Sequence, residues 1–257
     1  MSADGDAWFL LNASPEIRSQ IESFERLWPR APRHSPIAGL VLTNGDLDHC
    51  LGLFSLRESH PLVVHATESV REGLTRENVF YRTLERFPGQ VTWKPFVLGE
   101  EQPLGDGTLS ITAVPVPGKV PLHLEGRSAP SPGDNVGLVI RDTRSGGRLA
   151  YFSTVAGPSD VVSRAVAGAS VVFFDGTFWS SDELIRAGLG TRRAEDMAHW
   201  PIGGSDGSLG FLARQSGQRY LIHVNNTNPV LREDGPERRL ALAAGVDVAH
   251  DGLELTC

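Results

Sequence analysis

The chain has 257 residues and 40% of them are hydrophobic, which is enough to fill one large core or two small ones. A formal net charge of -7 argues against a nucleic-acid-binding surface. No apolar run reaches the roughly 18–20 residues that a membrane span needs, and the first residues lack the basic and apolar regions of a signal peptide. The cysteines Cys50 and Cys257 are too few for a disulfide framework or a cysteine-rich zinc site. We expect a cytoplasmic protein with no membrane span and no nucleic-acid partner.

Strand-like and helical segments alternate in the first half of the chain. Trp8-Phe-Leu-Leu11 is typical of a strand, and Ser14 before Pro15 predicts the N-cap of a helix over residues 16–26. Apolar runs predict further strands at residues 40–42 and 62–65. A helical segment is expected from residue 67 or 68 to 87, with a break near Thr75.

The second half continues the mixture. Strands are expected at residues 91–97, 109–114, 135–141, 148–153, 169–175 and 219–224, with short β-like pieces at 246–255. Helices are expected at residues 159–167, 208–215 and 236–244, the first of them capped by Ser159. No linker rich in glycine, serine or charge divides the chain. We therefore predict a single α/β domain over residues 1–257, with sheet layers covered by helices.

Potential metal ligands follow the predicted strand at residues 40–42. Thr43-Asn-Gly45 is a turn signal, and Asp46, Asp48 and His49 come directly after it. A rigid strand, an exposed loop and a helix start suit a ligand site, and carboxylate and imidazole suit Fe, Zn or Mn. Alternatively, Asp48 is the N-cap of a helix and His49 is a surface residue. The spacing alone leaves both interpretations open.

Two further predicted strands end on such residues, Asp175 and His223, while His199 and His123 lie in loops. Strand ends are where side chains from distant parts of a chain can converge. Alternatively, Asp175 caps a turn and His223 is a core histidine. The sequence contains no G-x-S-x-G nucleophile motif, no phosphate-binding loop and no G-x-G-x-x-G motif. The sequence therefore lacks the main motifs that would indicate a serine hydrolase or a dinucleotide-binding enzyme.

The order Asp-x-Asp-His, strand-end aspartate and strand-end histidine resembles the metallo-β-lactamase superfamily. That superfamily usually shows His-x-His-x-Asp-His, where this chain has Asn44, Asp46, Asp48 and His49. More specifically, the chain resembles the coenzyme PQQ synthesis protein B family. The resemblance rests on segments spread over most of the chain, at residues 12–18, 42–49, 51–53, 117–120, 175–179, 197–201 and 223–229.

The resemblance implies an αββα sandwich of the metallo-β-lactamase type, shortened at its N-terminus by the family's glycine-rich first strand and cysteine cluster. It also implies a role in making pyrroloquinoline quinone (PQQ). The expected activity is that of a non-haem iron oxygenase that uses O₂ to hydroxylate the tyrosine-derived ring of a Glu–Tyr-derived intermediate. Fe(II) is the expected metal and zinc the second, because the absence of the two leading histidines disfavours a two-zinc hydrolytic site. A homodimer is a further expectation.

The resemblance also assigns roles to residues. The expected metal-binding residues are Asp48, His49, Asp175 and His223, with Asp175 either a ligand or a partner of one. His199 and Asp46 are the expected catalytic residues. Substrate contacts are expected from Asn44, His123, Asn225, Asn226 and Arg193. Two other functions stay open: a zinc hydrolase that uses Asp48 as its base, and a non-catalytic carrier of PQQ or its precursor.

Overall fold

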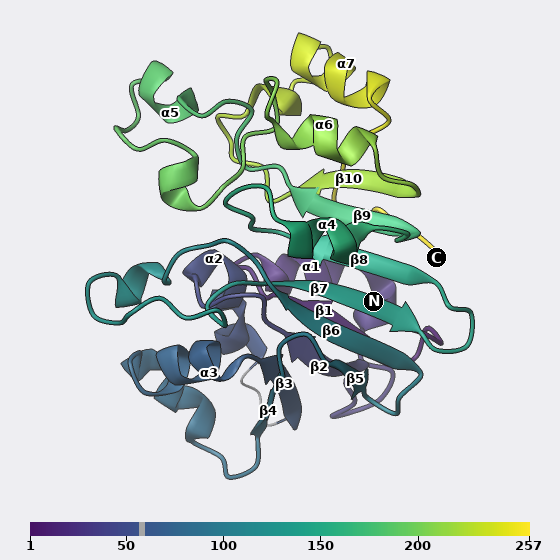
Figure 1. Ribbon diagram of the computed structural model, residues 1–257. Helices are drawn as coiled ribbons and strands as arrows, with labels where there is room; N and C mark the ends of the chain where they lie inside the picture. Colours follow the sequence, from purple (N-terminus) through teal and green to yellow (C-terminus); the bar gives the residue numbers. More distant parts are fainter. Residues whose placement is uncertain (57–59) are drawn as a thin grey trace. The chain divides into compact units, whose positions relative to one another are not determined.

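The computed structural model describes residues 1–56 and 60–257, which form two compact units (Figure 1). Unit 1 comprises Met1–Ala113 and Val120–Asn135, and unit 2 comprises Val114–Lys119 and Val136–Cys257. Each unit has its own hydrophobic core. A single domain over residues 1–257 stays a prediction.

Unit 1 is built on a sheet of four parallel strands in the order β1-β2-β3-β4. These are β1 (Trp8–Leu11), β2 (Ile37–Val41), β3 (Leu62–Ala66) and β4 (Val91–Pro95), and β5 (Glu101–Leu104) pairs antiparallel with β6 (Leu109–Pro115). The helices are α1 (Ile17–Ser23), α2 (Leu47–Cys50) and α3 (Glu68–Thr75), with 3-10 turns η1 (Glu25–Leu27), η2 (Leu51–Leu56), η3 (Val79–Glu85) and η4 (Leu122–Leu124). Leu40, Leu53 and Leu74 are fully buried in the core. Burial explains why β2 is predominantly apolar instead of alternating.

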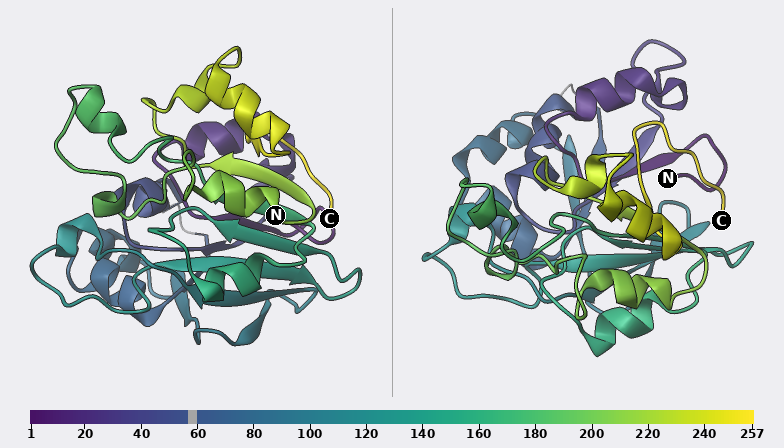
Figure 2. Two further views of the ribbon diagram at one scale, coloured as in Figure 1. Left: turned by 45° about the horizontal axis from the view of Figure 1, so that its top comes forward. Right: turned by 90° about the horizontal axis from the view of Figure 1, so that it is seen from above.

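Unit 2 contains strands in the order β11-β10-β9-β8-β7, parallel except for the antiparallel pair of β7 and β8. The strands are β7 (Val136–Asp142), β8 (Arg148–Phe152), β9 (Val171–Asp175), β10 (Gln218–Ile222) and β11 (Asp247–Val248). The helices are α4 (Asp160–Val166), α5 (Glu183–Arg186), α6 (Ser208–Ala213) and α7 (Pro236–Ala243), with η5 (Glu195–Met197) and η6 (Pro229–Leu231). Ala241 of α7 and Leu212 of α6 belong to the same buried cluster as Phe174 and Leu221 of the strands. Figure 2 shows α6 (light green) and α7 (yellow) beside β10.

The carboxyl ends of β8, β9 and β10 lie side by side (Figure 1). Phe152 is in register with Phe174, and Asp175 is in register with Ile222. Gly176 follows Asp175 because a Cβ there would lie 2.9 Å from the Ile222 carbonyl oxygen, which accepts a hydrogen bond from the Gly176 N–H at 2.8 Å. Side chains that follow these three strands are thus brought to one edge of the sheet.

The predicted strands are found. Three details of the predicted helices and strands differ from the structure. The helix expected from residue 16 to 26 is α1 and the turn η1, and the N-cap prediction for Ser14 is wrong. Glu16 is the cap residue, and the buried Ser14 hydroxyl has no hydrogen-bond partner within the described ranges. Strand β10 ends at Ile222, before residue 224, because His223 has a left-handed φ of 57°. The short segments β5 and α5 were not predicted.

None of the helices in the part of the chain that the structure describes is long and apolar enough to cross a membrane.

Candidate metal centre

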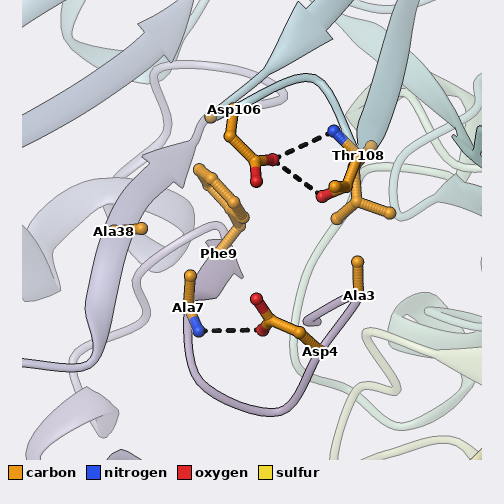
Figure 3. Close-up of a pocket in the computed structure, with 9 residues that line it drawn as sticks. Ala3, Asp4, Ala7, Phe9, Ala38, Asp106 and Thr108 are labelled. Atoms are coloured by element: carbon orange, nitrogen blue, oxygen red, sulfur yellow. Dashed lines mark hydrogen bonds between the residues drawn. The ribbon is translucent and has the colours of Figure 1, made fainter.

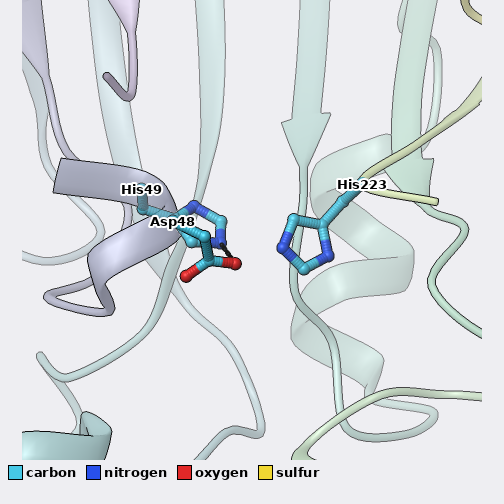
Figure 4. Close-up of side chains that lie close together, drawn as sticks. All are labelled: Asp48, His49 and His223. Atoms are coloured by element: carbon cyan, nitrogen blue, oxygen red, sulfur yellow. Dashed lines mark ion pairs between the residues drawn. The ribbon is translucent and has the colours of Figure 1, made fainter. Parts of the chain in front are cut away.

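In unit 1 the Asp-x-Asp-His motif folds into the start of α2. Asp46 is the N-cap residue and Asp48 lies within the first turn, so the alternative that Asp48 is the N-cap is wrong. The His49 side chain is 4% exposed and that of Asp48 is 58% exposed, and His49 Nε2 lies 3.6 Å from Asp48 Oδ2 (Figure 4). Two ligands bound at about 2.1 Å lie at most about 4.2 Å apart. The pair therefore has a separation that one ion can bridge.

His49 is held by a buried amide. Asn12 Oδ1 accepts hydrogen bonds from the Thr43 N–H at 2.9 Å and from the Thr43 hydroxyl at 3.1 Å. Its NH₂ group is therefore directed at His49 Nδ1, 2.8 Å away. Asn12 adopts a left-handed φ of 61°, which asparagine tolerates better than most residues. Gly52 is required nearby, because a Cβ there would lie 2.3 Å from the Ser14 carbonyl oxygen.

The other predicted residues of unit 1 are engaged with the backbone. Asn44 is buried and its Oδ1 accepts from the Asp46 N–H at 2.9 Å. Asp46 Oδ1 in turn accepts from the Leu122 N–H at 2.8 Å, and His123 Nε2 lies 3.2 Å from the Gly73 carbonyl oxygen. These contacts join the segment around residue 122 to the motif and to α3. A catalytic role for Asp46 and substrate contacts by Asn44 and His123 stay predictions.

The same long loop is also attached to α3 further along. The Thr67 hydroxyl donates to the Gly133 carbonyl oxygen at 2.6 Å, and the Ser69 hydroxyl donates to the Asp134 carboxylate. Between these attachments and those near residue 122, residues 125–132 are exposed.

In unit 2, Asp175 is fully buried at the end of β9 and each of its oxygens accepts two hydrogen bonds. Oδ1 accepts from the Thr177 N–H at 3.0 Å and the Thr177 hydroxyl at 2.7 Å. Oδ2 accepts from the Val155 N–H at 2.9 Å and from His199 Nδ1 at 2.8 Å. Burial alone would raise the pKa of Asp175, but attraction and hydrogen bonding from His199, with smaller contributions from His223 and Thr177, lower it. The carboxylate is therefore ionised and uses all four of its acceptor positions.

Two histidines share the polar group at this edge. His199 Nδ1 lies 3.0 Å and His223 Nδ1 2.8 Å from the Thr177 hydroxyl oxygen. The two rings stack with centroids 5.3 Å apart, and His223 stands just past the end of β10 (Figure 4). One candidate ligand atom from each of Asp175, His199 and His223 lies within 4.8 Å of the others. The structure thus brings together three of the residues that the sequence singled out.

The remaining predicted contacts of unit 2 lie on loops. The Asn225 side chain donates to the Thr227 hydroxyl at 2.7 Å, while Asn226 is exposed. The Arg193 side chain is also exposed, and the backbone N–H of Arg193 donates to Asp196 Oδ2 at 2.9 Å. Sequence reasoning missed the structural roles of Asn12 and Thr177. Both lie in segments that carry the family resemblance, but only the folded chain shows what their side chains bind.

A cavity of about 170 Å³ lies elsewhere in unit 1 and contains none of the predicted site residues. Its lining includes Phe9 and Leu109 and two carboxylates, Asp4 and Asp106. Figure 3 shows Phe9 and both carboxylates. Asp4 Oδ1 accepts from the Ala7 N–H at 3.1 Å, and Asp106 Oδ1 accepts from the Thr108 N–H at 3.0 Å. Local turns account for both acids.

Comparison with known proteins identifies the family of this chain. The sequence model of the Beta-lactamase superfamily domain matches residues 7–224. Coenzyme PQQ synthesis protein B of Azotobacter vinelandii (strain DJ / ATCC BAA-1303) is 41% identical over 258 residues, covering 99% of this chain and 85% of that protein. The protein of the same description from Methylobacterium sp. (strain 4-46) is 43% identical over 262 residues, covering 100% and 85%.

A comparison with solved structures finds the same family. The crystal structure of Zn²⁺-bound PqqB from Methylobacterium extorquens is 40% identical, covers 100% of this chain and 86% of that chain, and gives a TM-score of 0.92. A diphosphatase from the PhnP family, 20% identical with a TM-score of 0.66, shares the fold.

These matches define a protein of the beta-lactamase superfamily, and they confirm the predicted α/β fold of the metallo-β-lactamase type. Within that superfamily, the chain belongs to the coenzyme PQQ synthesis protein B family. The fold family and the zinc in the Methylobacterium extorquens structure imply a metal cofactor.

The side chains fit such a metal. Because Nδ1 of His199 and of His223 is directed at Asp175 and Thr177, Nε2 is the ring nitrogen through which each can bind an ion. Imidazole nitrogens suit iron and zinc. Asp175 has no acceptor position left, which favours the second of its two predicted roles, that of a partner that orients ligands.

Proposed function

We propose that this chain acts in PQQ synthesis as a metal-dependent oxygenase that hydroxylates the tyrosine-derived ring of a Glu–Tyr-derived intermediate. One atom of O₂ enters the ring, and the other leaves as water with two protons and with two electrons from a reductant. The proposal rests on membership in the coenzyme PQQ synthesis protein B family and on the donor set. The observation that carries it is the hydrogen bonding of Asp175 to His199 and of Thr177 to His223, which orients two imidazoles at the edge where β9 and β10 end.

For the metal we retain the sequence-based proposal that Asp48, His49 and His223 are ligands. Two imidazoles and one carboxylate form the ligand set of non-haem iron enzymes that activate O₂, and such an ion would supply that activation here. The two leading histidines of the usual dinuclear zinc motif are replaced by Asn44 and Asp46. One redox-active ion therefore fits the donor set better than two zinc ions do.

His199 would act on protons. Its Nδ1–H donates to the buried Asp175 carboxylate, so Nε2 can accept a proton while Asp175 stabilises the resulting imidazolium. The phenolic hydroxyl of a tyrosine-derived ring has an ordinary pKa of about 10. Removal of that proton by His199 would make the ring richer in electrons at the moment it is oxidised. The side chains of Asn225, Asn226 and Arg193 are proposed to bind the amino-acid carboxylates of the substrate.

A zinc hydrolase is the second candidate, because zinc is present in the related crystal structure. A carrier of PQQ or its precursor is the third. Metal content and O₂ uptake separate the three.

The test compares the wild-type protein with Asp48→Ala, each purified with and without air. We expect the anaerobic wild-type protein to contain about one iron per chain and to consume O₂ when the Glu–Tyr-derived intermediate and a reductant are added. Asp48→Ala should abolish metal binding. Two zinc ions with ester or lactone hydrolysis, or no metal with tight PQQ binding, would refute the oxygenase. Unchanged metal content in Asp48→Ala would refute Asp48 as a ligand.

A further inference from the structure

The hydroxyl of Thr177 lies at the centre of the polar group of unit 2. Thr177 follows β9 and is buried, and its Oγ1 lies near four polar atoms. These are Asp175 Oδ1 at 2.7 Å, His223 Nδ1 at 2.8 Å, His199 Nδ1 at 3.0 Å and the His223 carbonyl oxygen at 3.0 Å. One hydroxyl thus contacts both histidines and the carboxylate that accepts from His199.

The number of available protons decides which group donates in each contact. A hydroxyl has one proton to donate and two lone pairs to accept with. Asp175 Oδ1 and the His223 carbonyl oxygen can only accept, so the Thr177 proton goes to one of them, and the carboxylate is the nearer. The Thr177 oxygen must then accept from the imidazoles. His223 therefore has its proton on Nδ1, and His199 has the same tautomer through Asp175 Oδ2.

His223 has a left-handed φ of 57°, which is uncommon for residues other than glycine. Thr177 contacts both the ring and the carbonyl group of this residue. Its hydroxyl therefore sets where the His223 ring points as well as which nitrogen has the proton.

The surrounding scaffold does not depend on the hydroxyl. The Gly176 N–H donates to the Ile222 carbonyl oxygen at 2.8 Å, and the Asn225 N–H donates to the Thr177 carbonyl oxygen at 3.1 Å. The Asn228 side chain donates to the Gly176 carbonyl oxygen at 2.8 Å. These bonds hold residues 175–177 against residues 222–228 through the backbone. Valine, which has nearly the shape of threonine, should leave this scaffold folded.

We propose that Thr177 is a positioning residue whose hydroxyl fixes the Nδ1–H tautomer of His223 and thereby turns Nε2 of that ring toward the metal or substrate. The inference deepens the proposed function, because it concerns a histidine that would bind the ion. The tautomers themselves can be measured in the metal-free protein, so they do not depend on that function.

The experiment uses protein labelled with ¹⁵N at histidine, without metal, in the wild type, Thr177→Val and Thr177→Ser. Two-bond ¹H–¹⁵N correlation spectra show which ring nitrogen has the proton. We expect the Nδ1–H tautomer at residues 199 and 223 in the wild type and in Thr177→Ser, because serine keeps the hydroxyl. In Thr177→Val, His223 should become a mixture of tautomers while His199 keeps its proton toward Asp175.

A second measurement titrates the same proteins with Zn²⁺ and Co²⁺. Loss of a hydrogen-bonding partner of a ligand typically weakens metal binding about 10–100-fold, and we expect that loss for Thr177→Val and recovery in Thr177→Ser. An Nε2–H tautomer at His223 in the wild type would overturn the proposal whether or not Thr177→Val folds. Unchanged tautomers and affinity in a folded Thr177→Val would also overturn it. If the wild type binds neither ion, the metal-dependent function fails, while the spectra still decide the role of Thr177.

Discussion

The two units hold their histidines with opposite kinds of hydrogen-bond partner. In unit 2 a buried carboxylate and a hydroxyl accept from Nδ1 of His199 and His223. In unit 1 the NH₂ group of Asn12 donates to Nδ1 of His49. A donor at Nδ1 places the proton of a neutral ring on Nε2, on the side of Asp48.

If these histidines bind an ion through Nε2, those of unit 2 already have the required tautomer, whereas His49 would first have to move its proton. His49 can bind an ion through Nε2 once the Asn12 amide has exchanged the positions of its oxygen and nitrogen. Thr43 opposes that exchange, because its N–H donates to the amide oxygen. The units also differ in how they bury titratable groups: unit 2 buries an ionised acid with four donors, and unit 1 buries His65 at 5% exposure.

The largest effect on stability is expected at Asp175. Asp175→Ala leaves buried donors, including the Val155 N–H and His199 Nδ1, without an acceptor. Removing one member of a buried charged network typically costs about 3–5 kcal/mol, and we expect a loss of that size in urea unfolding. Asp48→Ala in unit 1 is the matched control, and with a 58% exposed side chain it should change stability by less than about 0.5 kcal/mol. Equal losses in the two variants would contradict the contrast between the units.

Acid should weaken unit 1 through His65. Burial, and to a smaller extent the charge of Lys94, lowers the pKa of His65 from 6.5 to about 4. Between these values the unfolded chain binds a proton that the folded chain excludes, so stability falls as pH drops through this window. From about pH 7.5 to about pH 5 we expect a loss on the order of 2 kcal/mol from this group.

His65→Gln should remove that part of the pH dependence, as measured by urea unfolding at both pH values. His65 stacks on Phe96 with ring centroids 5.9 Å apart, so the substitution also lowers stability at neutral pH. The informative quantity is therefore the change in the free energy of unfolding between the two pH values. If the variant and the wild type lose the same stability on acidification, His65 is not the group that titrates.

The smallest expected effect is a gain in metal affinity. Asn12→Asp gives His49 the kind of partner that unit 2 uses, a carboxylate that accepts from Nδ1–H, and aspartate also tolerates a left-handed φ of 61°. If His49 binds the ion through Nε2, Zn²⁺ affinity should rise about tenfold. Calorimetric titration at constant ionic strength measures it. Asn12→Ala is the control and should weaken binding, and weaker binding by Asn12→Asp as well would show that the amide, not an acceptor, is what His49 needs.

Sequence patterns identified the strands and the residues at their ends, because burial imposes apolar runs and because polar side chains follow where a strand leaves the core. Asp175 and His223 were found in this way, and the structure brings them together in unit 2 with His199, which was predicted to lie in a loop. The helix cap at Ser14 failed because the carbonyl group of that residue, and not its hydroxyl, closes the turn to Ile17. A pattern of residue types does not show which of the two groups is used.

The sequence did not show which side chains the site residues contact. Thr177 is two positions from Asp175, yet its contacts with His199 and His223 span 22 and 46 residues of chain. Asn12 reaches His49 across 37 residues. Such pairs depend on strand register and on unusual backbone angles, which emerge only when the sheet is assembled. The family resemblance marked these segments as important without saying what their side chains do.

The attachments of the long loop in unit 1 have a practical consequence. The loop is tied to Asp46 and α3 near residue 122 and again to α3 near residue 133, and residues 125–132 project between these points. Exposed tips of this kind accept inserted peptides, because lengthening an already closed loop costs little entropy. A fluorescent reporter or an affinity tag placed there should leave the Asp-x-Asp-His turn in place, which offers a way to follow the protein without labelling either end of the chain.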